Sequence, residues 1–241
     1  MSERTKPINL RQLMYIGGLL TIALYIVFLI IGWGLFPNPL SPLDHWLSDI
    51  GRYEVPADGG PVWRLIAGEW YLYTELFIPS IPNPGAIWYN LACILGGIGM
   101  FLFFSGFWQF REKNDRIFQV VNYLIMILGF IGGVFLILIG IFSEDGIFLI
   151  LIDAVISYPV HHTVTLIFFL MLLIIKVLAG FWAWKMNFNR LISLYSWVII
   201  VFDAIVVFTG NSSSLIEWIS VLTSLGLLGI LDIGLYFSEL E

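Results

Sequence analysis

Long apolar stretches, each with its few charges near the ends, constrain this chain more than any other feature of its sequence. A helix needs about 20 predominantly apolar residues to cross the hydrocarbon core of a bilayer. Six stretches approach or exceed that length: residues 13–36, 87–110, 117–142, 163–184, 191–209 and 215–237. The sequence therefore predicts an all-α fold, a single-domain polytopic bundle of six transmembrane helices with both termini on one side of the membrane.

The composition argues against other classes of protein. Hydrophobic residues make up 59% of the chain and charged residues only 12%, so a soluble domain of this size would lack the polar surface that it needs. An outer-membrane β-barrel requires alternating polarity, whereas residues 124–141 are apolar on every face. The net charge of -6 argues against a nucleic-acid partner. The single cysteine, Cys93, excludes a disulfide framework and a cysteine zinc site.

The distribution of lysine and arginine predicts the orientation, because cytoplasmic connections retain positive charge. Only Arg52 and Arg64 fall on the side away from the termini. The cations on the side of the termini are Arg4, Lys6, Arg11, Arg111, Lys113, Arg116, Lys185 and Arg190. We therefore expect a cell-membrane protein with both termini in the cytoplasm and with two acidic extracytoplasmic loops.

The longer of these loops, residues 37–86, has the length of a functional segment or a folded cap. Ser41 or Asp44 could cap a short helix over residues 44–48. The aromatic-rich segment 62–78 suits a position at the level of the lipid headgroups. In the second loop an apolar run over residues 147–156 is too short to span the membrane, which favours an interfacial or re-entrant helix.

All three histidines of the chain map to the outer boundary of the predicted bundle, beside carboxylates and a serine. This candidate site comprises His45, Ser48, Asp49, Glu144, Asp145, His161 and His162. Imidazole and carboxylate groups can hold a divalent metal or act as a general base toward water. The chain has no H-x-x-x-H or H-E-x-x-H spacing, and no cofactor is identified. Metal binding, base catalysis and simple hydrogen bonding to headgroups or loop carbonyls all stay open.

The predicted spans contain Lys176, Asp203 and Asp232, and ionisable groups in such positions are costly and need partners. A snorkelling Lys176 would reach the depth of Asp232, so we expect a structural ion pair between them. Asp203 lies nearer the outer end of its helix and is expected to face the outer site. Glycines that allow close helix packing recur in the second and third spans, at Gly96, Gly97, Gly99, Gly129, Gly132, Gly133 and Gly140.

Short motifs accompany these spans in a fixed order. They are LSDIG at residues 47–51, WYNLACILGGIG at 88–99, GIFSEDG at 140–146 and the histidine pair at 161–162. Together they resemble the domain-of-unknown-function 998 family of prokaryotic six-helix membrane proteins, over most of the chain up to about residue 169. That family is distantly similar to the eukaryotic Frag-like group, which is linked to the handling of lipid anchors. The resemblance implies a six-helix fold and work on lipids.

Three functions follow from these observations. The sequence favours an outer-leaflet pocket, capped by the two acidic loops, that binds a lipid or lipid-linked ligand near His45, Asp49, Glu144 and His162, with turnover of that ligand left open. The alternative is a non-enzymatic subunit that packs against other membrane proteins or against itself, because an apolar surface with glycine faces serves that role equally well. A small transporter or channel is third. The intramembrane charges Lys176, Asp203 and Asp232 would form its polar path, but the spans lack broken-helix symmetry and rings of charge.

Overall fold

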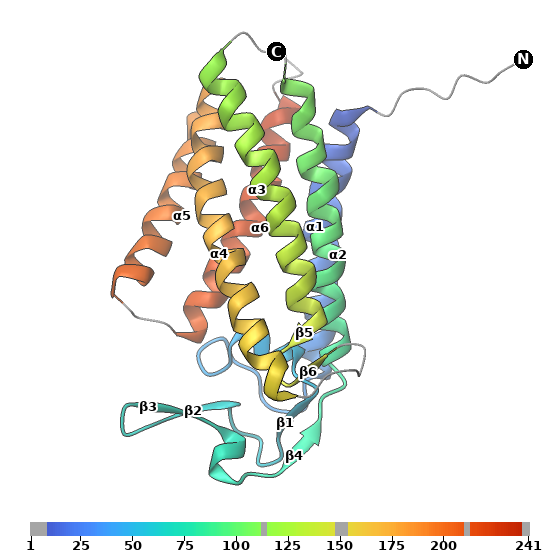
Figure 1. The fold of residues 1–241 in the computed structure, drawn as a ribbon, viewed down its shortest axis with the longest axis vertical. Coiled ribbons are helices and arrows are strands. Elements are labelled where there is room, and N and C mark those ends of the chain that lie inside the picture. Colours follow the sequence, from blue (N-terminus) through green and yellow to red (C-terminus); the bar gives the residue numbers. More distant parts are fainter. Residues whose placement is uncertain (1–8, 112–114, 148–153, 210–212, 238–241) are drawn as a thin grey trace, which may run out of the picture.

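The fold is a bundle of six long helices that lie side by side along the longest axis of the molecule (Figure 1). The computed structural model describes residues 9–111, 115–147, 154–209 and 213–237. The helices are α1 (Leu10–Leu35), α2 (Ala86–Ser105), α3 (Arg116–Ile141), α4 (Ala154–Lys185), α5 (Arg190–Thr209) and α6 (Ser214–Phe237). The beginning of α1 and the end of α6 lie at the same end of the bundle, here termed the terminal end (Figure 1).

Five segments of the described chain are helical, long enough and apolar enough to cross a membrane. They are α1, residues 86–110 of α2 and the 3-10 helix η3 (Gly106–Phe110) that extends it, α3, residues 160–185 of α4, and α6. The predicted multi-pass membrane architecture is confirmed at this level. Helix α5 has 20 residues, and its role as a sixth span stays a prediction.

Helix α4 begins at Ala154, before the predicted start of the fourth span at residue 163, so the histidine pair at 161–162 lies within the helix. Most of the predicted interfacial helix over residues 147–156 lies outside the described residues.

Polar side chains and prolines set the helix ends. Asn9 caps α1 by accepting a hydrogen bond from the backbone N–H of Arg11 at 3.0 Å. Helix α1 ends at Leu35 because Pro37 forces the residue before it, Phe36, into an extended conformation. Asp115 caps α3 with one carboxylate oxygen and binds the Lys185 ammonium with the other, at 2.8 Å, which ties the start of α3 to the end of α4.

Helices α1, α2 and α3 pack closely through glycine, as the sequence predicts. A Cβ atom added to Gly97 of α2 would lie 2.6 Å from the carbonyl oxygen of Gly133 on α3, which is too close for any side chain. Gly17 of α1 is equally crowded by the backbone of α2. The Thr21 hydroxyl, also on α1, donates a hydrogen bond to the Gly17 carbonyl at 2.8 Å, so this buried hydroxyl is paired within its own helix.

The segment between α1 and α2, residues 36–85, folds over the other end of the bundle, here termed the capped end, and is called the cap below (Figure 1). Its elements are the 3-10 helices η1 (Leu47–Gly51) and η2 (Tyr73–Leu76) and the strands β1 (Glu54–Pro56), β2 (Trp63–Ile66), β3 (Glu69–Leu72) and β4 (Ser80–Pro82). Strands β1 and β4 pair antiparallel, as do β2 and β3. A small core of Phe36, Val55, Val62 and Tyr73 lies inside the cap.

The local structure of the cap differs from one sequence-based expectation and adds detail to another segment. A turn leads into η1 where a short helix over residues 44–48 was predicted. The aromatic segment 62–78 forms the β2–β3 hairpin followed by η2. The hairpin turn is Ala67-Gly68, and positive φ angles at both residues give the tight turn whose twist matches the strands. A second small pair, β5 (Phe142–Ser143) with β6 (Gly146–Ile147), follows α3 and faces the cap.

Candidate functional site

A buried ion pair joins the cap to the turn between β5 and β6. The Arg52 guanidinium donates to the Glu144 carboxylate at 2.6 Å, and the two side chains are only 4% and 6% exposed. Burial alone would lower the pKa of Arg52, but Glu144 and the neighbouring acidic groups Asp145 and Asp49 raise it above its ordinary value. The pair is therefore charged, and it links segments 92 residues apart in the sequence.

The neighbouring carboxylate, Asp145, holds the cap backbone. Its two oxygens accept hydrogen bonds from the N–H groups of Tyr53 at 3.0 Å and Glu54 at 2.8 Å. Ser143 donates to the Gly146 carbonyl at 2.8 Å across the same turn. These contacts assign Asp145 a structural role, because its acceptor oxygens are occupied by backbone donors.

Glu144 is also contacted from α4 and from η1. The Ser48 hydroxyl donates to its Oε1 atom at 3.0 Å, and Nε2 of His161 lies 3.9 Å from the same oxygen. Burial would raise the pKa of Glu144, but Arg52, His161 and Ser48 together lower it below its ordinary value. Nδ1 of His161 lies 2.6 Å from the Phe142 carbonyl oxygen. A carbonyl only accepts, so Nδ1 carries the hydrogen in that contact and Nε2 is directed toward Glu144.

Asp49 and His45 are buried without full hydrogen bonding. Asp49 Oδ2 accepts from the Trp46 N–H at 2.8 Å, while Oδ1 has no partner among the described residues. Burial, and secondly Glu144, raises the pKa of Asp49 well above its ordinary value. His45 packs its ring edge-on against Phe36 at 5.5 Å between centroids, neither ring nitrogen has a described partner, and burial lowers its pKa. Among the described residues, the His45 ring thus forms no hydrogen bond with Glu144 or His161.

A cavity of about 490 Å³ opens beside this polar group, between α4 and α6 and under the cap. That volume falls within the range of roughly 300–1,000 Å³ typical of ligand pockets. Polar side chains line it at the capped end, and apolar side chains of α4 continue toward the middle of the bundle. Its lining comprises Trp46, Ser48, Trp63, Trp70, Glu144, His161, His162, Thr165, Leu166, Phe169, Leu170, Leu173, Asp203, Ser213, Ile216, Glu217 and Ser220.

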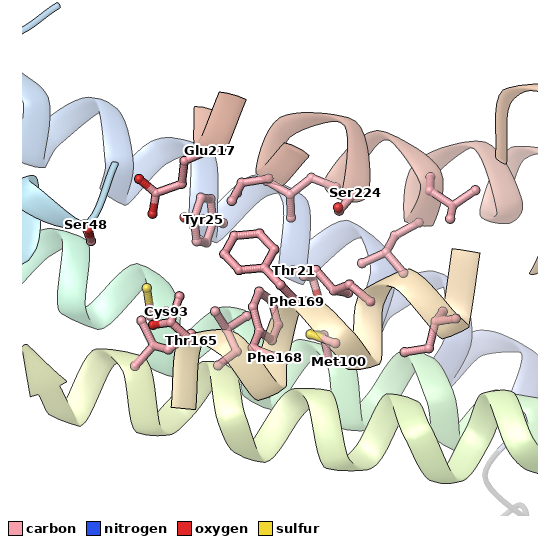
Figure 2. A pocket seen from close by; sticks show the side chains of 18 of the residues that line it. Thr21, Tyr25, Ser48, Cys93, Met100, Thr165, Phe168, Phe169, Glu217 and Ser224 are labelled. Carbon is pink, nitrogen blue, oxygen red and sulfur yellow. The ribbon is translucent and has the colours of Figure 1, made fainter. Parts of the chain in front are cut away.

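A smaller interior cavity of about 60 Å³ adjoins the first. Figure 2 shows Ser48, Tyr25 and Glu217 at its end nearest the cap, with Met100 and Ser224 farther along the bundle. The two cavities share the lining residues Ser48, His161, Thr165, Phe169 and Glu217. The Thr165 hydroxyl is buried and has no described partner. The shared residues form a polar neck between the two spaces.

Glu217 and Arg52 are the residues of this region that the sequence analysis did not assign to the site. Glu217 lies in the first turn of α6, and its Oε2 atom accepts from the Leu47 N–H at 2.7 Å. The available signal was its acidic charge inside a predicted span, which by default marks a functional position. The distribution of cations uses Arg52 only to orient the chain in the membrane, although this residue immediately follows the LSDIG motif.

The intramembrane charges pair differently from the prediction. Lys176 Nζ of α4 binds Asp203 Oδ2 of α5 at 2.5 Å, so the predicted pair between Lys176 and Asp232 is wrong. The other oxygen of Asp203 accepts from the Ser220 hydroxyl at 2.9 Å, and Asp203 lines the larger cavity. Asp232 lies instead against Gly18 of α1, and its Oδ1 atom has no described partner.

The structure thus places three of the seven predicted site residues in one network, Ser48, Glu144 and His161, while Asp145 holds the cap backbone beside it. The charges of Glu144 and Arg52 act on the buried Asp49, and His162 lines the larger cavity. Among the described residues no group of three His, Cys, Asp or Glu side chains is arranged to hold a metal ion.

Comparison with known proteins gives one match. A family model described as "Protein of unknown function (DUF998)" matches residues 74–233. The match begins after the LSDIG segment and continues through most of α6, so the resemblance extends well beyond residue 169. Neither the curated proteins nor the solved structures contain a match to this chain.

Proposed function

The chain belongs to the family described as Protein of unknown function (DUF998), and from its cavity we propose that it binds a lipid or lipid-linked ligand in the membrane leaflet next to the cap. The observation that carries this proposal is the cavity of about 490 Å³ between α4 and α6, with its polar and apolar linings at different depths. The predicted orientation makes this leaflet the outer one.

The length of the cavity supports the proposal. Its lining on α4 runs from His161 to Leu173, which at 1.5 Å per residue corresponds to about 18 Å. The hydrocarbon core of a bilayer is about 30 Å thick, so one leaflet contributes about 15 Å. The cavity therefore extends through about one leaflet, as an acyl chain does.

The polarity of the lining supports it too. Ser48, Glu144, His161 and Glu217 gather at the capped end, where a headgroup would lie. Leu166, Phe169, Leu170 and Leu173 line the deeper part, where an acyl chain would lie, and the one carboxylate on α5 in the lining, Asp203, is paired with Lys176. A small soluble ligand would not require this apolar extension.

Photo-crosslinking tests the proposal. The purified full chain would be placed in nanodiscs that contain a phospholipid with a diazirine on its acyl chain, irradiated, and the labelled peptides mapped by mass spectrometry. We expect labelling within residues 161–173 of α4. Leu170→Trp should reduce that labelling, because Leu170 lines the cavity and is 47% exposed, so a larger side chain fills the space without entering the core.

A matched variant controls for nonspecific contact with bulk lipid. Ile127 of α3 is 50% exposed and lies outside both cavity linings, so Ile127→Trp should leave the labelling of α4 unchanged. Equal labelling of α4 in the wild type and in Leu170→Trp would overturn the proposal. Co-purification with another membrane protein at fixed stoichiometry, unchanged by Leu170→Trp, would favour the role of an accessory subunit.

A further inference from the structure

One carboxyl group in the lining of the larger cavity forms no ion pair within the described chain. Glu144 is paired with Arg52, and Asp203 is paired with Lys176. Glu217 is the remaining carboxylate in the lining. It is held by the backbone N–H groups of Leu47 and Ser48, and no cation within the described chain forms an ion pair with it.

Glu217 is well placed to meet a ligand. Its side chain lines both cavities at the polar neck, as do Ser48 and His161, and Figure 2 shows it at the same end of the smaller cavity as Ser48. Most of the surface around it is apolar, and in such surroundings a carboxyl group either keeps its proton or needs an opposite charge to compensate the carboxylate. A ligand with a positive charge would supply that compensation.

Aromatic side chains border the same end of the cavity. Trp46 comes from the chain just before η1, and Trp63 and Trp70 come from the β2–β3 hairpin. Indole rings attract cations through the negative faces of their π systems, and they accommodate substituted ammonium groups better than ions that must keep their water. Tryptophan and carboxylate together suit an ammonium group more than a phosphate or a bare hydroxyl.

We propose that the capped end of the cavity recognises a lipid whose headgroup carries an ammonium group, with Glu217 as its counter-ion and Trp46, Trp63 and Trp70 as its aromatic wall. This inference rests on the proposed function, because it names the headgroup chemistry of the same lipid site. The apolar lining of α4 holds the acyl chain, and the carboxylate selects the headgroup.

Three photoreactive lipids with identical acyl chains test the headgroup preference: phosphatidylethanolamine, phosphatidylglycerol and diacylglycerol. In nanodiscs of otherwise identical composition, phosphatidylethanolamine should label residues 161–173 of the wild type most strongly. Glu217→Gln keeps the side-chain volume and an acceptor for the Leu47 N–H but removes the charge. It should reduce the preference for the ammonium lipid about tenfold, the scale of one charge-assisted contact, and leave labelling by diacylglycerol unchanged.

Two further variants sharpen the test. Glu54→Gln removes an exposed carboxylate of β1 outside both linings and should keep the full preference. Trp70→Leu changes a hairpin side chain that is 49% exposed, so it should spare the fold and weaken the preference about two- to fivefold.

The outcomes separate the two proposals. Equal labelling of the wild type by the three lipids, or an undiminished preference in Glu217→Gln, would overturn the headgroup assignment while lipid binding stands. If no lipid labels residues 161–173 of the wild type above the level of Leu170→Trp, both proposals fall. The wild-type comparison decides the headgroup question whatever the stability of the variants.

Discussion

Removing the buried guanidinium of Arg52 should be among the most damaging single changes to this protein. The Arg52 and Glu144 side chains are 4% and 6% exposed, and the pair is 2.6 Å apart. In Arg52→Met most of the apolar stem is kept, but Glu144 loses its cation and keeps only Ser48 and the more distant His161 as partners. Breaking a buried pair on one side costs about 3–5 kcal/mol, because a charge is left uncompensated.

A double variant tests whether the lost stability comes from the uncompensated charge. Replacing both charges, in Arg52→Met with Glu144→Gln, removes the uncompensated carboxylate and should recover most of the loss. The assay is equilibrium unfolding by denaturant in detergent micelles, for the wild type, both single variants and the double variant. The cycle yields the coupling energy between the two side chains directly.

An exposed pair in the same cap is the matched control. Arg64 and Asp58 also lie 2.6 Å apart, but their side chains are 22% and 43% exposed. Water screens such a pair, so Arg64→Met should cost at most about 1 kcal/mol. If Arg52→Met cost no more than Arg64→Met, or if the double variant were as unstable as Arg52→Met, burial of the pair would not control the stability of the cap.

Three further predictions concern pH and packing. Glu144 has a lowered pKa, so it stabilises the fold above the pKa of its unfolded form, about 4.3, and that advantage over Glu144→Gln should disappear as the pH falls further. Asp49 has a raised pKa and the opposite sign: the stability of the wild type relative to Asp49→Asn should fall as the pH rises above about 3.9. Parallel unfolding free energies across the pH titration would contradict either expectation. Gly17→Ala would force a methyl group into the backbone of α2 at Phe103 and should cost about 1–3 kcal/mol of unfolding free energy, whereas Gly34→Ala meets open space and should be neutral or gain up to about 1 kcal/mol.

The helices could be predicted from the sequence because the length of an apolar stretch reports directly on the membrane that it must cross. The partner of Lys176 could not be predicted in the same way. Comparing positions along the helix axes gave the depth of Lys176 and Asp232 but not the direction in which each side chain points. Helices consecutive in sequence are usually neighbours, and that rule would have favoured Asp203 on α5, where the partner lies.

The candidate site could likewise be predicted from the sequence only in part. The sequence placed Glu144, Asp145 and His161 at one boundary because all three adjoin predicted spans. It could not separate Asp145, whose oxygens hold cap backbone, from Glu144, whose oxygens receive side chains. The distribution of cations along the sequence used Arg52 only as evidence of membrane orientation. Whether this cation is exposed or buried depends on its contact with Glu144, 92 residues away in the sequence.

The 92 residues between Arg52 and Glu144 also impose an order on the formation of their contact during biosynthesis. The cap is translated before α2 and α3, so the nascent chain contains Arg52 while its carboxylate partner is still 92 residues from being made. At 5–20 residues per second the interval is about 5–18 s. The same holds for the backbone donors of Tyr53 and Glu54, which acquire the Asp145 acceptors only after α3 has been synthesised. Maturation of the cap is therefore a late event that waits for the hairpin following α3, although the cap comes early in the chain.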